Sequence, residues 1–245
     1  MTKTKILVRI SLFSMILLLL IVILSFLFMP KNNLKDFGMD QVSANGILGE
    51  KKNTIDVLIL GDSETYTSFS PLQMYEAHGF TSYICGTSGQ RLYDSYDFLE
   101  KTLENQKPKV VILETNAIFR DYDLKTTVLA KWKNLIPLLK YHNRWKNLTI
   151  HDFSSKITYT YTDPNKGFRI KKGIMPVKNH DYMKKMDKSK TIPKLNIHYL
   201  DKMKDLCDEL GITFILISSK SIKNWNDAKH QSVSNYANQK EIAFY

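Results

Sequence analysis

Cysteine and internal repeats are what this sequence lacks most, and each shortage excludes a class of protein. Cys85 and Cys207 are the only cysteines in 245 residues, too few for a disulfide framework, and both lie in apolar patterns that predict small core residues. No segment repeats at the period of a solenoid, and no low-complexity tract is present. A hydrophobic content of 43% excludes a disordered chain, so we expect one α/β domain or two small domains.

Acidic residues are also in short supply, with 24 Asp and Glu against 35 Lys and Arg and a formal net charge of +11. Part of this excess is local, because residues 166–190 hold nine Lys or Arg and only Asp181 and Asp187 as acids. The segment is interpreted either as a solvated basic loop or as an electrostatic footprint for an anionic polymer or a membrane surface. No nucleic-acid-binding motif accompanies the charge, so we expect no nucleic-acid partner.

One long apolar run stands near the N-terminus. Residues 10–29 contain no charge, and at about 1.5 Å per residue they span a hydrocarbon core of roughly 30 Å. Three basic residues before the run favour a cytoplasmic N-terminus: Lys3, Lys5 and Arg9. A cleaved signal peptide is the rival interpretation, but the run is longer than a usual signal core and no A-x-A-like site follows it. We therefore predict a single-pass cell-membrane anchor with the C-terminal domain extracellular.

Short apolar runs separated by helical segments predict a parallel sheet in the rest of the chain. Five strands are expected, the last of them only begun: 55–60, 81–85, 109–114, 212–217 and 242–245. Five helices are expected around them: 71–78, 92–103, 126–145 with a break at Pro137, 194–210 and 224–239. The Thr and Tyr alternation in residues 157–174 predicts a hairpin outside the main sheet.

These elements give a simple domain plan. Residues 1–9 are expected in the cytoplasm, 10–29 in the membrane and 30–54 in a linker. Residues 55–245 are expected to form the α/β domain, within which 126–193 is a basic insertion that contains aromatic residues.

Three of the predicted strands end in residues suited to nucleophilic catalysis. In chain order these strand ends are Gly61-Asp62-Ser63, Gly86-Thr87-Ser88-Gly89 and Glu114-Thr115-Asn116. Because the carboxyl ends of parallel strands meet at one edge of a sheet, Ser63, a loop amide near Gly89 and the Asn116 amide are expected to converge. A serine nucleophile requires donors aimed at the oxyanion that it creates, and such amides are the usual donors. A Gly-Asp-Ser tripeptide alone is more typical of a plain turn.

The ordered trio resembles the SGNH (GDSL-like) hydrolase superfamily. Gly61-Asp62-Ser63 matches its serine block, Gly89 fits its glycine block with Gly86 as the competing choice, and Asn116 stands where its third block has an asparagine. That third block departs from the pattern, because Glu114 replaces its glycine and Ala117 replaces its aspartate. The resemblance implies a flavodoxin-like, three-layer α/β/α domain with a mainly parallel sheet, here preceded by one transmembrane helix.

Within the superfamily, the chain looks most like membrane-anchored surface proteins of Gram-positive bacteria. The anchor, the Tyr-His-Asn-Arg-Trp-Lys segment at 141–146 and the Lys-Gly-Phe segment at 166–168 suggest this. Proteins of that style include D-alanine transfer proteins of teichoic acid and O-acetyl transferases of surface polysaccharide. The resemblance therefore implies a cell-wall or surface glycopolymer as substrate and a multi-span membrane acyltransferase as a possible partner.

The resemblance also implies a base in a D-x-x-H block after the fifth strand, whose aspartate orients the histidine. The sequence stops at Tyr245 inside that strand, so we expect the block to lie beyond it and the chain to be an incomplete member. One D-x-x-H is present, and its Asp227 and His230 are either surface neighbours on a solvated helix or a relocated base. The other histidines have weaker claims: His78, His142, His151, His180 and His198.

Other chemically suggestive residues have two interpretations each. Glu114 is either a catalytic acid or, at a buried strand end, a carboxyl paired with a basic group or a backbone donor. Trp132, Trp145 and Trp225 are interpreted as the lining of a sugar cleft or as core residues, and their helical spacing favours the core. No cluster has the spacing of metal ligands, so we expect no metal and no cofactor.

Two hypotheses of different classes follow. In the first, an anchored enzyme transfers or removes acyl groups on a surface glycopolymer, with Ser63 as nucleophile and the Ser63, Gly89 and Asn116 amides around the oxyanion. In the second, a non-catalytic protein of the same fold binds the polymer or supports a partner acyltransferase. The two differ in one feature, because only the enzyme requires a histidine that reaches Ser63.

Overall fold

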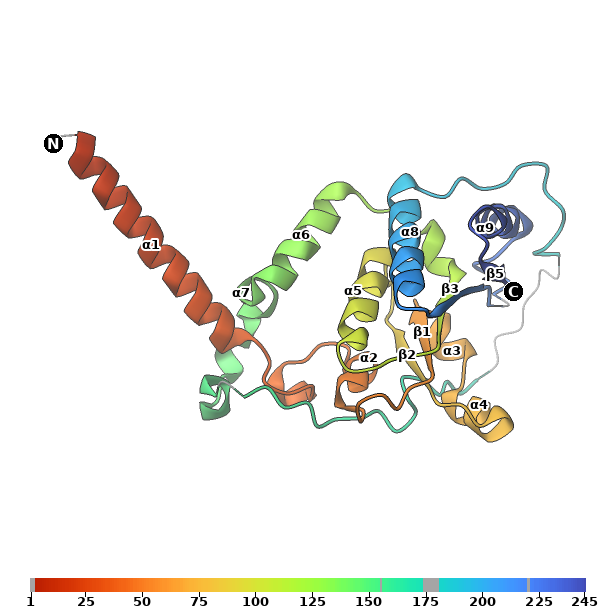
Figure 1. Ribbon diagram of the computed structural model, residues 1–245, viewed down its shortest axis with the longest axis horizontal. Coiled ribbons are helices and arrows are strands. Elements are labelled where there is room, and N and C mark those ends of the chain that lie inside the picture. The colour runs from red at the N-terminus through yellow and green to blue at the C-terminus, as the bar shows by residue number, and fades with distance from the viewer. Residues whose placement is uncertain (1–2, 155, 174–180, 220) are drawn as a thin grey trace. The chain divides into compact units, whose positions relative to one another are not determined.

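The computed structural model describes residues 3–154, 156–173, 181–219 and 221–245 (Figure 1). The chain divides into two compact units. Unit 1 comprises Met1–Asp40 and Asp123–Thr160, and unit 2 comprises Gln41–Tyr122 and Tyr161–Tyr245.

Unit 2 is built on a five-stranded sheet in which every neighbouring pair is parallel. The strands follow the order β2-β1-β3-β4-β5, which is a doubly wound order of the flavodoxin type. Their bounds are β1 Val57–Gly61, β2 Ser82–Gly86, β3 Val110–Glu114, β4 Thr213–Ile217 and β5 Ala243–Phe244. The predicted parallel α/β sheet is confirmed.

Helices lie on both sides of the sheet, which explains why its inner strands are apolar on both faces. Val57 and Ile59 pack with Tyr66 of α3 (Thr65–Ser68), and the alternation of a strand sends Leu58 and Leu60 to the other face. Figure 1 shows α5 (Leu92–Leu103) and α8 (Lys194–Glu209) on one side of the strands and α3 and α4 (Pro71–His78) on the other.

The helix ends follow the expected local chemistry. Pro71 stands at the first turn of α4, and Gly79 ends that helix in the left-handed conformation with φ +74°. Asn226 caps α9 (Asp227–Gln239), because its side-chain oxygen accepts from the Lys229 N–H at 3.0 Å. Helix α9 is joined to α8 by the Tyr236 hydroxyl, which donates to Asp201 at 2.9 Å.

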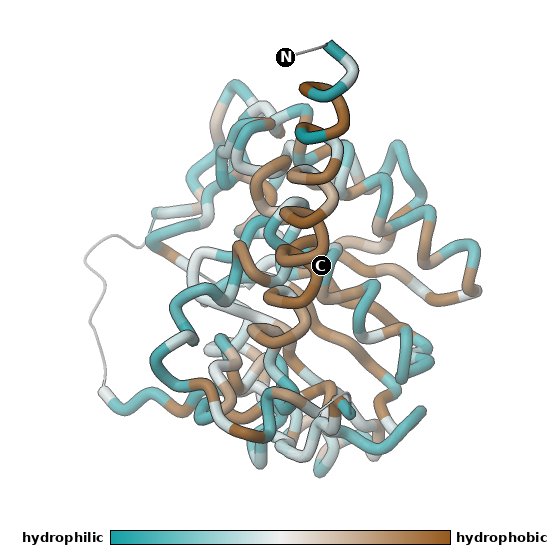
Figure 2. The backbone as a smooth tube through the Cα atoms, turned by 90° about the vertical axis from the view of Figure 1, so that its left-hand side faces the viewer, coloured by the Kyte–Doolittle hydropathy of each residue, from teal (hydrophilic) through white to brown (hydrophobic). Residues whose placement is uncertain are grey.

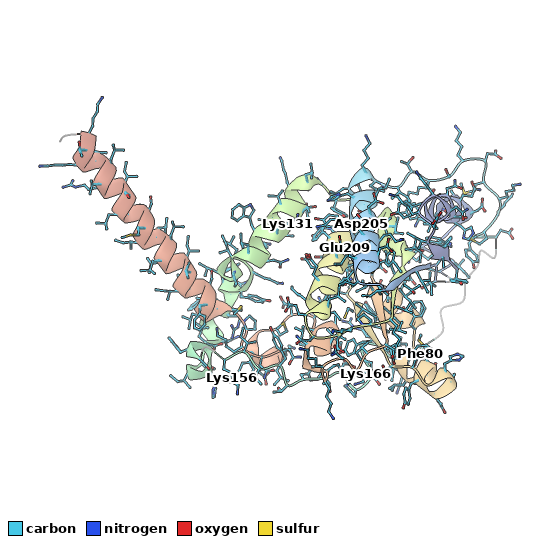
Figure 3. All side chains as sticks on the ribbon, viewed as in Figure 1. Phe80, Lys131, Lys156, Lys166, Asp205 and Glu209 are labelled. Atoms are coloured by element: carbon cyan, nitrogen blue, oxygen red, sulfur yellow. The ribbon has the colours of Figure 1, made fainter. Side chains whose placement is uncertain are left out.

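The predicted hairpin at 157–174 is wrong over its described residues, because 157–173 contain no strand. Its second half instead runs beside the outer edge of β2, where the Ile84 N–H donates to the Lys166 carbonyl at 2.9 Å. Gly167 has φ +86°, and a Cβ there would clash with the Ile84 carbonyl oxygen. Lys166, labelled in Figure 3, also pairs with Glu50 at 2.8 Å. The alternating pattern therefore marks a segment that covers a sheet edge, which a single sequence does not distinguish from a hairpin.

Short helices also occupy the segment predicted as a linker. They are η1 Lys35–Phe37, α2 Val42–Asn45 and η2 Gly46–Gly49. The Tyr83 hydroxyl of β2 donates to the Ser43 carbonyl of α2 at 2.7 Å, so α2 is fastened to the sheet within unit 2.

Unit 1 contains α1 (Lys3–Phe28), the one helix among the described residues that is long and apolar enough to cross a membrane. Its most apolar window has a mean hydropathy of 3.0 and is not buried, and Figure 2 shows the hydrophobic colour along the helix. The predicted break at Pro137 is confirmed, because the next helical stretch divides into α6 (Leu124–Leu135), α7 (Pro137–Tyr141) and η4 (His142–Asn147). A last short helix, η5, covers Ile150–Phe153.

A buried ion pair holds the end of α1. Arg144 and Asp152 pair with side chains only 7% and 1% exposed, and Arg144 also donates to the Phe28 carbonyl at the last turn of α1. Carbonyls at a helix C-terminus lack partners within the helix, and a cation there also interacts favourably with the helix dipole. The Arg144 contact therefore stabilises the point at which the apolar helix ends.

Candidate active site

Ser63 lies in the turn that joins β1 to α3, at the carboxyl end of the strand. Gly61 enters this turn with φ +150°, and a Cβ there would clash with Thr65 Oγ1 and lie 3.0 Å from the Glu114 Cβ. Glycine is thus required for the close approach of β1, α3 and β3. The Ser63 side chain is half-buried, and its carbonyl accepts from Thr67 Oγ1 at 2.8 Å, which fixes the turn.

The order of the strands places Ser63 at the point of the sheet where ligands are expected to bind. The chain leaves β1 toward β2 on one side and returns past β1 to β3 on the other, so the carboxyl ends of β1 and β3 flank the topological switch point. In open parallel sheets, the crevice at that point is where ligands bind. Ser63 and Asn116 follow the two strands concerned.

Asp62 is the centre of the hydrogen-bond network at this edge. Its side chain is fully buried and accepts three donors: Asn116 Nδ2 at 2.9 Å, Arg120 Nη2 at 2.8 Å and the Glu64 N–H at 3.0 Å. Gly89 also lies here, because a Cβ built on it would be 3.9 Å from Arg120 Nη1. The structure therefore brings the three predicted strand ends together around the Asp62–Arg120 ion pair.

Asn116 uses part of its donor capacity inside this network. One side-chain N–H binds Asp62, and its backbone N–H donates to Glu114 Oε2 at 3.1 Å. A carboxamide nitrogen carries two hydrogens, so one N–H of Asn116 is left for another acceptor. Asp62 thus orients an amide that retains a donor at the switch point.

Glu114 is a buried acid with an unusual proton affinity. Its side chain is 1% exposed, and its pKa is raised to about 8, first by burial and then by the negative charge of Asp62. Hydrogen bonds from the Ser219 and Asn116 N–H groups oppose this rise without cancelling it. At neutral pH, Glu114 is therefore mostly a neutral acid. The expectation that it binds backbone donors is confirmed.

The loop after β4, to which the start of α9 is hydrogen-bonded, also contacts the turn that contains Ser63. Glu64, next to Ser63, accepts from Ser221 Oγ at 3.1 Å and from the Asn224 amide. Lys229 donates to the Asn224 carbonyl, and burial lowers its pKa, as does the nearby charge of Lys190. Glu64 thereby links the nucleophile turn to residues more than 150 positions away.

Two cations flank the ring of Phe119. The amines of Lys190 and Lys229 lie 5.7 and 5.5 Å from its centroid. The ring of Trp225 also meets Phe119 edge-on, with the two ring centroids 6.1 Å apart. Positive charge is therefore concentrated close to the Asp62–Arg120 pair, since the charges of Asp62 and Arg120 also act on Lys229.

Asp227 and His230 do not pair with one another in the structure. Asp227 Oδ2 accepts from the Met186 N–H at 2.8 Å and from Gln231, while the His230 ring packs on Phe244 with centroids 5.0 Å apart. Over the described residues, Ser63 Oγ has no histidine as a hydrogen-bond partner. The structure thus places the serine, glycine and asparagine together and does not join the Asp227–His230 candidate to them.

The remaining histidines lie elsewhere. His78 stacks on Phe80 (labelled in Figure 3) near the amino ends of the strands, where a pocket opens beside Asp56 and Val57. His198 meets Tyr199 in α8, and His142 binds the Leu139 carbonyl. His151 lies in η5 of unit 1, and His180 falls outside the described residues.

The tryptophan and cysteine predictions have mixed outcomes. Cys85, Cys207 and Trp225 are core residues as predicted, with Trp225 only 5% exposed. Core packing is wrong for Trp132 and Trp145, which are 51% and 63% exposed. Helical spacing identifies a shared face and does not say what covers it.

Sequence patterns do not identify three of the residues in this network: Glu64, Arg120 and Lys229. Arg120 directly follows the short 3-10 helix Thr115–Phe119 that contains Asn116, and this closeness along the chain is the only hint that both side chains bind Asp62. No group of three His, Cys, Asp or Glu side chains among the residues that the structure describes is arranged to hold a metal ion.

Comparison with known proteins finds distant structural likenesses only. No protein-family model matches the chain, and no curated protein is significantly similar in sequence. A lipolytic-type protein of the G-D-S-L family from Desulfitobacterium hafniense is 15% identical with a TM-score of 0.39, and the match covers 78% of this chain and 76% of that one. Similarity this low leaves function to be argued from the residues themselves.

Two further solved structures belong to the same group of matches. A GDSL-like lipase from Bacteroides thetaiotaomicron is 14% identical with a TM-score of 0.32, over 77% of this chain and 66% of that one. A protein assigned as an acylhydrolase from Bacteroides fragilis is 13% identical with a TM-score of 0.35, over 83% and 74% of the two chains.

Proposed function

We propose that the chain is a membrane-anchored ester hydrolase or O-acyltransferase that acts on a cell-surface glycopolymer. The observation that carries the proposal is the placement of Ser63 at the switch point, with Gly89 and Asn116 gathered around the same Asp62–Arg120 pair. This supports an acyl-transfer site because a serine nucleophile and amide donors meet where parallel sheets bind ligands.

The chemistry follows from the roles of these groups. Ser63 Oγ attacks the ester carbonyl carbon, the carbonyl oxygen becomes an oxyanion, and the alcohol of the polymer leaves as the acyl–serine ester forms. The Ser63 and Gly89 amides and the remaining Asn116 N–H are assigned to the oxyanion. Water then releases the acyl group as a carboxylic acid, or a second hydroxyl accepts it. These two outcomes separate the hydrolase from the transferase.

The serine proton requires a base, and this is the least complete part of the site. Asp227 and His230 remain the candidates within the described chain, although each is engaged elsewhere. His230 would have to leave Phe244 and turn toward Ser63 to accept the proton. A base supplied by a further segment would remove that requirement.

The same proposal includes the location and the partners. Helix α1 serves as the single-pass anchor, with the three basic residues before it on the cytoplasmic side and unit 2 outside the cell. The basic stretch 166–190 is assigned to an anionic polymer, and a multi-span membrane acyltransferase is a possible partner that supplies the acyl group.

Covalent labelling of Ser63 tests the enzymatic proposal. The full chain in detergent micelles is treated with a fluorescent serine-directed phosphonate, and labelling is expected to be lost in Ser63→Ala. Ser68→Ala is the matched control, because Ser68 is an exposed serine of the same segment, in α3. Ser68→Ala is expected to label like the wild type, and labelling that survives in Ser63→Ala would sink the assignment of the nucleophile.

A second candidate function is a non-catalytic polymer-binding or acyltransferase-supporting protein. The separation of Asp227 from His230, and the absence of a histidine bonded to Ser63 over the described residues, favour it. Its test is binding of the full chain to an anionic wall polymer across a salt series. Binding that weakens as salt rises is expected from screening of the basic stretch. Binding that ignores salt counts against the basic stretch as the contact surface.

A further inference from the structure

Helix α6 carries an apolar stripe that is exposed within unit 1. Leu124, Val128, Trp132 and Leu135 follow one another at the spacing of a single helix face, and they are 67%, 49%, 51% and 73% exposed. Four large apolar side chains aligned on one exposed face are uncommon in soluble proteins and mark an interaction surface.

More exposed apolar residues follow in the same unit. They lie in α7, η4 and η5 and include one further tryptophan: Leu139, Trp145, Ile150 and Phe153. We call these four residues and the four residues of the α6 stripe, taken together, the unit 1 apolar face. Two tryptophans on such a face are typical of membrane interfaces, where one part of the ring is apolar and its N–H is wet.

Lysines accompany the apolar face. Residues 123–160 contain seven Lys or Arg against two Asp. Along α6, Lys125 and Lys131 fall next to the two borders of the apolar stripe at 100° per residue, and Lys131 is labelled in Figure 3. An apolar face bordered by lysines matches the surface of a bilayer that contains anionic lipid.

The contacts of α7 and η4 with the end of α1 are a separate observation that points to the membrane surface. The Leu138 N–H of α7 donates to Ser25 Oγ at 3.4 Å, and Arg144 of η4 donates to the Phe28 carbonyl. Ser25 and Phe28 belong to the last turn of the apolar helix. If α1 crosses the hydrocarbon core, its last turn lies at the lipid–water boundary, and α7 and η4 lie there too.

We propose that the unit 1 apolar face lies in the membrane–water interface on the extracellular side and binds the bilayer surface there. Helix α6 then acts as an interfacial amphipathic helix. The proposal rests on the anchoring role given to α1 in the proposed function. The apolar stripe enters the boundary between headgroups and acyl chains, and the lysines contact anionic headgroups. The consequence is that unit 1 is fixed to the membrane by α1 and by a second, lateral contact.

Fluorescence quenching by brominated lipid tests this directly. The full chain is reconstituted into vesicles of phosphatidylcholine and phosphatidylglycerol, with bromine placed high on the acyl chains. The chain has three tryptophans, so the wild type is compared with Trp132→Phe combined with Trp145→Phe, which leaves only the buried Trp225 of unit 2. Both substitutions are at exposed positions and preserve an aromatic ring, so the fold is expected to persist.

The expected result is that the wild type loses about half of its emission in brominated vesicles, since two of its three tryptophans lie on the interfacial face. The double variant is expected to lose almost none. Equal, low quenching of both proteins would overturn the interfacial face. Protection of Trp132 that depends on the protein-to-lipid ratio would also overturn it, in favour of a second copy of the chain.

An alkaline carbonate wash separates this inference from the anchor. If the protein stays with the vesicles after the wash but is not quenched, α1 still acts as an anchor and the proposed interfacial face is wrong. If the protein is washed off, both the anchoring role of α1 and the interfacial face are wrong. The face is placed at the interface only by its contacts with α1.

Discussion

Arg120→Leu is expected to destabilise unit 2 by about 3 kcal/mol, a large fraction of the stability of a domain this size. The variant leaves Asp62 fully buried with only Asn116 Nδ2 and the Glu64 N–H as donors. A buried carboxylate that loses its cation keeps its desolvation cost and loses the attraction that offsets it. Leucine preserves part of the apolar stem, so the loss of charge dominates the change.

Lys109→Leu is the matched control for this effect. Lys109 pairs with Asp56 at 3.0 Å, but its side chain is 81% exposed, so its removal is expected to cost less than about 1 kcal/mol. The measurement is the free energy of unfolding of both variants by denaturant titration of the full chain in detergent micelles. Similar losses in the two variants would contradict the central position given to the Asp62–Arg120 pair.

Glu114→Gln is expected to flatten the pH dependence of stability between about pH 4.5 and pH 8. In the folded chain, Glu114 holds its proton up to about pH 8, while in the unfolded chain it releases the proton near its ordinary value of 4.5. Between these values the folded state binds more protons than the unfolded state. The stability contributed by the group is therefore fully present below about pH 4.5 and falls by about 1.4 kcal/mol for each pH unit up to pH 8.

Glutamine copies the neutral acid and has no proton to release, so this slope disappears in the variant. A constant loss of about 1–2 kcal/mol is expected at all pH values, because a carboxamide accepts only on one side from the Asn116 and Ser219 N–H groups. The measurement is the unfolding free energy at several pH values from 5 to 8. Glu104→Gln, at the exposed end of α5, controls for the loss of one acidic group. A wild-type slope in Glu114→Gln would show that the carboxyl ionises freely.

Most of the sheet and its helices follow from local patterns. Helix α5 has the bounds given by its apolar period, and α4 has those given by Pro71 and Gly79. Strands β1 and β3 are runs of apolar residues, and a run that is apolar on both sides is buried on both faces. Such signals are carried by neighbouring residues, and a single sequence therefore contains them.

The site network is less accessible to sequence reasoning because its partners lie far apart. Arg120 and Asp62 are 58 positions apart, and Asn224 and Glu64 are 160 positions apart. The order of strand-end motifs predicts that the segments meet, but it does not say which side chain binds which. The oxyanion role given to Asn116 illustrates this, because one of its two side-chain N–H groups is held by Asp62.

The exposed face of unit 1 shows a different limit of the sequence pattern. An apolar period predicts a helix with one apolar side, and it predicts the same helix whether protein or lipid covers that side. The helical spacing therefore favours a core position over a sugar cleft for Trp132, whereas its side chain is 51% exposed, and this exposure is one of the observations behind the proposed interfacial face.

The most direct test of the account is the intact mass of the chain after reaction with an activated acetyl ester. The wild-type chain is expected to carry one acetyl group on the segment with Ser63, as placed by peptide mapping, and Ser63→Ala is expected to carry none on that segment. Asp227→Asn and His230→Gln then show whether either residue supports the reaction. A wild-type chain that neither carries an acetyl group on Ser63 nor releases acetate faster than Ser63→Ala would contradict the claim that the switch-point serine is a nucleophile.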